Sequence, residues 1–125
     1  MNQQQALDIV YAYHESQFPK ACSTCGRRFE TLADYIRSTS RIGRTISYDA
    51  DQGDWETAKP MGTFALANCA CGTTLALSTD GMPTQLRQQL LAWVKQECEQ
   101  RALQPSDVID RLRDQVRARA LSHQR

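Results

Sequence analysis

The fold depends on two short cysteine motifs, Cys22-Ser-Thr-Cys25-Gly26 and Cys69-Ala-Cys71-Gly72, which lie far apart in the chain. Residues two apart in an extended segment point to the same side, so the second pair can aim both sulfurs at one ion. The wider spacing of the first pair requires a turn, and the glycine after each pair can take the positive φ that such turns need. We therefore predict that the two motifs meet and that their four sulfurs surround a single cation.

Four thiolates are the ligand set of a closed tetrahedral zinc site, so Zn2+ is the expected ion and its expected role is structural. Treated as a cross-link, the ion closes a loop of about 45 residues, which contributes roughly 4 kcal/mol in the chain-entropy model. Arg27, Arg28 and Arg44 are close enough in sequence to offset the excess negative charge of such a site. Two alternatives stay open: cysteines without a metal in a reducing cytosol, and disulfides in an oxidising compartment.

The first motif resembles the zinc knuckle of zinc-ribbon and rubredoxin-like proteins, and the second resembles a shortened knuckle. The resemblance covers the two motifs and not the whole chain. The second pair has a single intervening residue, and the long segment between the pairs is expected to contain a helix. The resemblance implies that Cys22, Cys25, Cys69 and Cys71 bind zinc, or iron in the rubredoxin branch, where electron transfer would follow.

Hydrophobic periodicity predicts the secondary structure around these motifs. A period of 3.6 residues predicts helices over residues 3–16, 31–40, 84–101 and from residue 106 or 107 onward. Alternation predicts strands over residues 44–48, 63–68 and 73–78. We therefore expect one zinc-clamped α+β domain over residues 1–125. Its expected parts are an N-terminal helix (1–18), an antiparallel meander with an inserted short helix (19–80) and a C-terminal helical pair (81–125).

Length, composition and charge limit the class of protein. The chain has 125 residues, 41% of them hydrophobic, and 15 Lys and Arg against 14 Asp and Glu give a formal net charge of +1. This length suits a single domain. The near-neutral charge excludes the strong global field of a dedicated phosphate-backbone binder. The sequence has no apolar run of transmembrane length and no signal-peptide pattern at its start, so we expect a soluble cytoplasmic protein without a membrane partner.

Five further residues have both a structural and a functional interpretation. His14 is a conceivable metal ligand, but its place on the apolar face of the first helix favours packing. Cys98 continues an apolar stripe, which favours a buried small hydrophobe over a redox-reactive thiol. The aromatic residues Tyr48, Trp55 and Phe64 are expected to fill the core under the sheet, and the alternative is an exposed contact surface.

The sequence indicates a protein that is not an enzyme. It lacks an arrangement of nucleophile, base and orienting acid and has no glycine-rich phosphate motif, and four thiolates leave no open coordination position. We expect an interaction or regulatory module that acts through a protein partner or a homodimer formed by residues 84–121, with no small-molecule substrate. One alternative is nucleic-acid binding through basic residues near the first motif, namely Arg27, Arg28, Arg37, Arg41 and Arg44. Another is a thiolate redox switch or a rubredoxin-like iron protein.

Overall fold

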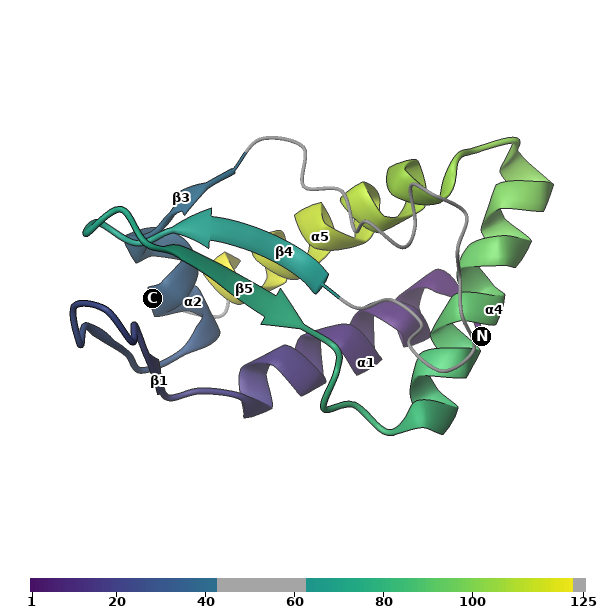
Figure 1. Ribbon diagram of the computed structural model, residues 1–125. Coiled ribbons are helices and arrows are strands. Elements are labelled where there is room, and N and C mark those ends of the chain that lie inside the picture. The colour runs from purple at the N-terminus through teal and green to yellow at the C-terminus, as the bar shows by residue number, and fades with distance from the viewer. Residues whose placement is uncertain (43–62, 123–125) are drawn as a thin grey trace.

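The computed structural model describes residues 1–42 and 63–122, and these residues form an α+β fold (Figure 1). The helices are α1 (Gln3–Ser16), α2 (Leu32–Ser38), α4 (Thr84–Arg101) and α5 (Pro105–Ser122). The strands are β1 (Lys20–Ala21), β2 (Arg28–Phe29), β3 (Ser40–Arg41), β4 (Thr63–Asn68) and β5 (Thr74–Ser78). Strands β1 and β2 pair in one antiparallel sheet, and a second antiparallel sheet has the order β3-β4-β5. The expected fold class is confirmed.

Helix α1 has the bounds that its periodicity predicts, and a capping box fixes its start. The Asn2 side chain accepts a hydrogen bond from the Gln5 backbone N–H, and the Gln5 side chain accepts one from the Asn2 N–H, each at 2.8 Å. These bonds satisfy two of the backbone donors that a helix start leaves unpaired. The apolar stripe that includes Leu7 and Val10 then enters the core.

Helix α2 begins where the Thr31 hydroxyl accepts a hydrogen bond from the Asp34 N–H at 3.0 Å. Its face with Leu32 and Ile36 is buried. The sequence predicts an end near residue 40, and the observed end is slightly earlier. The helix ends at Ser38 because Thr39 is extended, with φ −121° and ψ 157°, and the next two residues form strand β3.

Replacing the residue that caps α2 tests how much this start contributes to stability. We expect Thr31→Ala to lower the free energy of unfolding by about 1 kcal/mol, because the Asp34 N–H loses its acceptor. Thr31→Ser keeps a hydroxyl in place and is the matched control, with an expected change of only a few tenths of a kcal/mol. Urea denaturation measures the free energy of unfolding of both variants. Equal losses in the two variants would show that the Thr31 hydroxyl does not stabilise the helix start.

Strands β4 and β5 form the central hairpin of the larger sheet. Their register pairs Ala67 with Leu75 and Asn68 with Thr74, close to the turn that joins the strands. The predicted strands at 63–68 and 73–78 match β4 and β5 to within one residue. The predicted strand at 44–48 lies outside the described residues.

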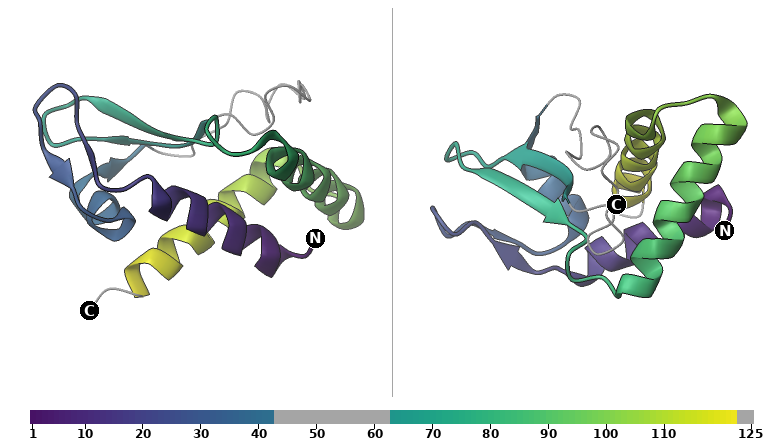
Figure 2. Two further views of the ribbon diagram at one scale, coloured as in Figure 1. Left: turned by 90° about the horizontal axis from the view of Figure 1, so that it is seen from below. Right: turned by 45° about the vertical axis from the view of Figure 1, so that its right-hand side comes forward.

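The C-terminal helices cover the core from the side opposite the sheet. Figure 2 shows α1 and α5 crossing beneath the β3-β4-β5 sheet, with α4 alongside, and α5 contacts α1, α2, α4 and β4. The apolar stripes of the pair are buried, among them Leu90 and Val94 on α4 and Leu112 and Val116 on α5. Among the described residues, Met1 is the one large hydrophobic side chain that is exposed. No helix in this part of the chain has the length and apolarity needed to cross a bilayer.

Candidate metal centre

The two cysteine motifs occupy the tips of two hairpins. Cys22 and Cys25 lie in the loop between β1 and β2, and Cys69 and Cys71 lie in the turn between β4 and β5. These tips lie side by side at the same end of the molecule in Figures 1 and 2. The β1-β2 hairpin is a finding that the sequence did not predict, because two-residue strands are too short to show alternation.

The same backbone pattern closes both loops. In the first, the Gly26 N–H donates to the Cys22 carbonyl at 2.9 Å, and the Cys22 N–H donates to the Arg27 carbonyl at 2.9 Å. In the second, the Gly72 N–H donates to the Cys69 carbonyl at 2.8 Å, and the Cys69 N–H donates to the Thr73 carbonyl at 2.8 Å. The glycines have φ values of 77° and 94°, as their predicted role requires.

A methyl group at position 26 tests this requirement. A Cβ on Gly26 would have no heavy atom within 4 Å, so any cost of a substitution comes from the backbone alone. We expect Gly26→Ala to lower the free energy of unfolding of the metal-loaded protein by about 1 kcal/mol, whereas Gly26→Asn should cost less because asparagine tolerates this region. Chemical denaturation measures both, and an alanine variant as stable as the parent would contradict the prediction.

The four sulfurs converge on one point between the hairpin tips. All four Sγ atoms lie within 4.8 Å of one another. The Sγ atoms of Cys22 and Cys71 are 3.8 Å apart, and those of Cys25 and Cys69 are 3.7 Å apart. A disulfide needs about 2.05 Å, and all four cysteines are free thiols. Tetrahedral zinc with bonds of about 2.3 Å places neighbouring sulfurs about 3.8 Å apart, so the cluster can hold such an ion.

Hydrogen bonds around the cluster favour thiolate at two of its members. The backbone N–H groups of Cys25 and then Thr24 lower the pKa of Cys22 to about 6. The hydroxyl and backbone N–H of Thr73 lower the pKa of Cys71, and the hydroxyl oxygen lies 3.1 Å from that sulfur. Metal binding requires deprotonated thiols, so these contacts prepare two ligands.

The thiol of Cys25 shows how the neighbouring sulfurs affect one another when no cation lies between them. The backbone N–H of Arg27 lowers the pKa of this thiol, but partial desolvation and the three neighbouring sulfurs outweigh that effect and raise the pKa to about 11. Several thiolates this close together repel one another unless a positive charge lies between them. A bound metal ion supplies that charge, and its ligand set would be the four cysteines that the sequence predicts.

The cluster lies at the boundary between the core and the protein surface. Cys22 and Cys69 are buried, whereas Cys25 and Cys71 are exposed. The ion would therefore be anchored by two sulfurs in the core and closed off by two sulfurs at the surface.

Three of the five candidate arginines contact other side chains within the described residues. Arg28 forms an ion pair with Glu30 at 2.6 Å, and the guanidinium of Arg27 lies over the Phe29 ring, 5.7 Å from its centroid. Arg41 pairs with Asp114 of α5 at 2.8 Å. Of the other two, Arg37 lies in the last turn of α2, and Arg44 lies outside the described residues.

Among the described residues the metal cluster comprises four cysteines, and neither His14 nor Cys98 belongs to it. His14 is fully buried, and its ring stacks on the buried Phe64 ring with centroids 4.9 Å apart. Cys98 is half-buried against the core, and burial, followed by the nearby Asp107, raises the pKa of its thiol. The other two aromatic residues considered above, at positions 48 and 55, lie outside the described residues.

Comparisons of this chain with protein-family models, with curated proteins and with solved structures gave no match. Function is therefore inferred from the geometry of the site.

Proposed function

We propose that this chain is a structural metal-binding module in which Cys22, Cys25, Cys69 and Cys71 hold one Zn2+. The observation that carries the proposal is the spacing of the sulfurs, because 3.7 and 3.8 Å match the edge of a zinc-thiolate tetrahedron. Zinc would supply a cross-link here and no reaction chemistry, since four thiolates close its coordination sphere.

The cross-link would join two parts of the fold that lack a shared strand ladder. Among the described strands, β1 and β2 form one sheet and β3, β4 and β5 form another. The two close sulfur pairs, Cys22 with Cys71 and Cys25 with Cys69, each take one member from either hairpin. A bound ion therefore fixes the first hairpin against the second, which is a structural role.

A module of this kind acts by presenting a surface to a partner, and we propose that it is not an enzyme. We further propose that it acts through a protein partner or a second copy of itself, with residues 84–121 as the contact. The burial of the apolar stripes within the chain leaves the polar faces of α4 and α5 for this contact. Light scattering at micromolar concentration should give twice the monomer mass, and a monomer mass would reject the homodimer.

Metal analysis tests the proposal directly. Protein purified without added metal should contain one zinc ion per chain, and cobalt substitution should give the absorption of a tetrahedral thiolate site. Cys69→Ser should lower the metal content, while Cys98→Ser, which changes a cysteine outside the cluster, should leave it unchanged. Absence of bound metal in the parent, or equal metal content in the two variants, would contradict the proposal. Visible absorbance of the protein as purified would identify iron in place of zinc.

The exposure of Cys25 and Cys71 favours a second candidate function, a redox switch. In such a switch hydrogen peroxide oxidises two thiolates to one disulfide, is itself reduced to water, and the ion is released. A colorimetric zinc indicator would record release at peroxide concentrations that leave Cys98 unmodified. Retention of zinc under those conditions assigns the site a purely structural role.

A further inference from the structure

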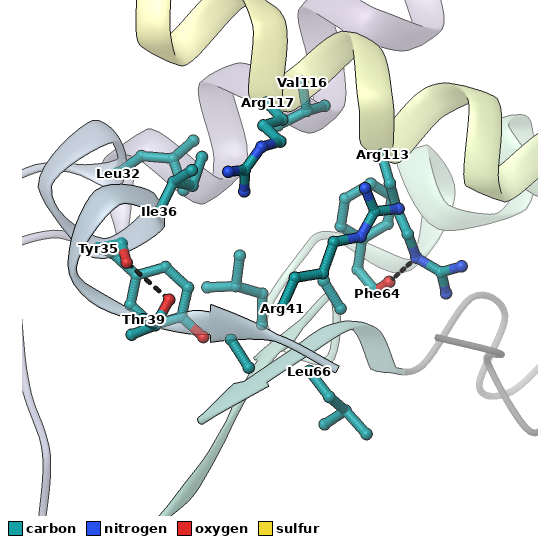
Figure 3. Close-up of a pocket in the computed structure, with 13 residues that line it drawn as sticks. Leu32, Tyr35, Ile36, Thr39, Arg41, Phe64, Leu66, Arg113, Val116 and Arg117 are labelled. Carbon is teal, nitrogen blue, oxygen red and sulfur yellow. Dashed lines mark hydrogen bonds between the residues drawn. The ribbon is translucent and has the colours of Figure 1, made fainter. Parts of the chain in front are cut away.

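A pocket without an assigned role lies between α2, the larger sheet and α5, and it shares no lining residue with the cysteine cluster. Its walls are mainly apolar and include Leu32 and Ile36 from α2, Phe64 and Leu77 from the sheet, and Val116 from α5. Figure 3 shows these elements enclosing the space. A ligand that entered it would exchange water for hydrocarbon contacts.

Positive charge borders the pocket. Arg41, Arg113 and Arg117 all line it. The buried Arg113 pairs with Asp110 at 2.6 Å and donates a hydrogen bond to the Phe64 carbonyl.

The remaining two arginines differ in their partners. Arg41 pairs with the exposed Asp114, a kind of surface contact that contributes little to stability and can be exchanged for another carboxylate. Arg117 forms no ion pair with any residue in the described part of the chain, and its guanidinium extends from α5 toward the space between α2 and the sheet (Figure 3). Within the described part of the chain, the edge of the pocket thus carries one guanidinium that has no ion-pair partner.

A second observation concerns a buried polar group in the wall of the pocket. Tyr35 lines the pocket from α2 and is 4% exposed, yet its hydroxyl has no hydrogen-bond partner among the described residues. Buried hydroxyls normally find a partner, because leaving one unpaired is unfavourable. A ligand oxygen or a water carried in with a ligand would supply that partner.

The size of the pocket limits the ligand. Its volume is about 60 Å³, less than half of the roughly 150 Å³ that holds a benzene ring in an engineered cavity. The enclosed space therefore suits a short aliphatic chain and not an aromatic ring. Arg117 lines the pocket and is exposed, so a polar head group bound to it can stay outside the enclosed space.

We propose that this pocket binds a short-chain aliphatic carboxylate, with its hydrocarbon end against Leu32 and Val116 and its carboxylate on Arg117. The apolar walls favour the hydrocarbon chain, and the guanidinium favours the negative charge. Arg41 can contribute a second contact by exchanging Asp114 for the ligand. This ligand is an addition to the function proposed above, and the sequence did not indicate any small molecule.

The test is a titration of the full, metal-loaded chain followed by 1H-15N NMR. The probes are acetate, butyrate, hexanoate and octanoate, with 1-butanol and butylamine as controls for charge. We expect butyrate to bind most tightly and to shift the amide signals of residues that line the pocket, such as Ala67 and Val116. The alcohol and the amine should bind at least about tenfold more weakly, because they lack the carboxylate.

Two variants on the same helix separate the site from general anion binding. Arg117→Gln should weaken butyrate binding at least about tenfold, and Arg111→Gln, an exposed residue outside the pocket lining, should leave it unchanged. Unchanged spectra of the metal-loaded parent on addition of butyrate would overturn the proposal. Equal binding of butyrate and 1-butanol, or equal loss in the two variants, would also overturn it. None of these results bears on the metal site, since the protein carries its metal throughout.

Discussion

Replacing one cysteine of the cluster should remove a large part of the stability of this chain. We expect Cys69→Ser to lower the free energy of unfolding by about 4 kcal/mol. The physical reason is the loop that the ion closes between the two hairpins, which restricts the unfolded chain as a cross-link does. Domains of this size are stable by only about 5–15 kcal/mol in total, so the variant should be marginal. Chemical denaturation followed by near-ultraviolet circular dichroism measures the loss.

The matched control for this experiment is the same substitution at the fifth cysteine. Cys98→Ser changes a half-buried thiol that lies outside the cluster, and it should cost no more than about 1 kcal/mol. Adding a chelator should destabilise the parent and Cys98→Ser by the same large amount and should have little effect on Cys69→Ser. If the chelator leaves the parent's unfolding transition where it was, the ion is not a structural element of this fold.

The elements that the sequence predicts well are those with a long periodic pattern. Helices α1 and α4 have the predicted bounds because several turns of apolar stripe determine each of them. Helix α5 begins at Pro105, slightly before the predicted start, because proline is well tolerated in a first turn. Short strands carry no such pattern, which is why β1, β2 and β3 were not predicted.

The ligand set of the metal centre was also predictable, but the contacts around it were not. The spacing within each cysteine pair and the glycine after it indicate a turn that can direct two sulfurs to one point. No sequence pattern indicates that Thr73 lies 3.1 Å from the Cys71 sulfur, or which sulfurs lie nearest each other across the hairpins. The pocket near Arg117 was missed for the same reason, because it forms only where α2, α5 and the sheet meet.

The buried histidine should make the stability of this protein strongly dependent on pH. Desolvation by burial, and then the charge of Lys20, lower the pKa of His14 to about 4 from its usual 6.5. The unfolded chain therefore binds a proton between these two values that the folded chain does not bind. The contribution is fully present above about pH 6.5 and is lost as the pH falls toward 4, and it amounts to about 3 kcal/mol.

Replacing this histidine by phenylalanine isolates that effect. His14→Phe keeps an aromatic ring against Phe64, and it removes two ring nitrogens that lack hydrogen-bond partners among the described residues. At about pH 7.5 the variant should be at least as stable as the parent, because no native hydrogen bond is lost. At about pH 4 it should be more stable by roughly 3 kcal/mol, since it no longer has a group that must be protonated on unfolding.

Acid also protonates cysteine ligands and releases metal, so the measurement must be a difference between two proteins. Loss of the ion at low pH affects the parent and His14→Phe equally, because this histidine is not part of the four-cysteine cluster. Urea denaturation of both proteins at a series of pH values, repeated with a chelator present throughout, gives two difference curves. We expect both curves to rise as the pH falls from about 6.5 to 4, with the same amplitude. Parallel stability profiles for the two proteins would contradict this prediction. They would show that the His14 ring gains its proton as readily in the folded chain as in the unfolded one, so that its burial does not make stability depend on pH.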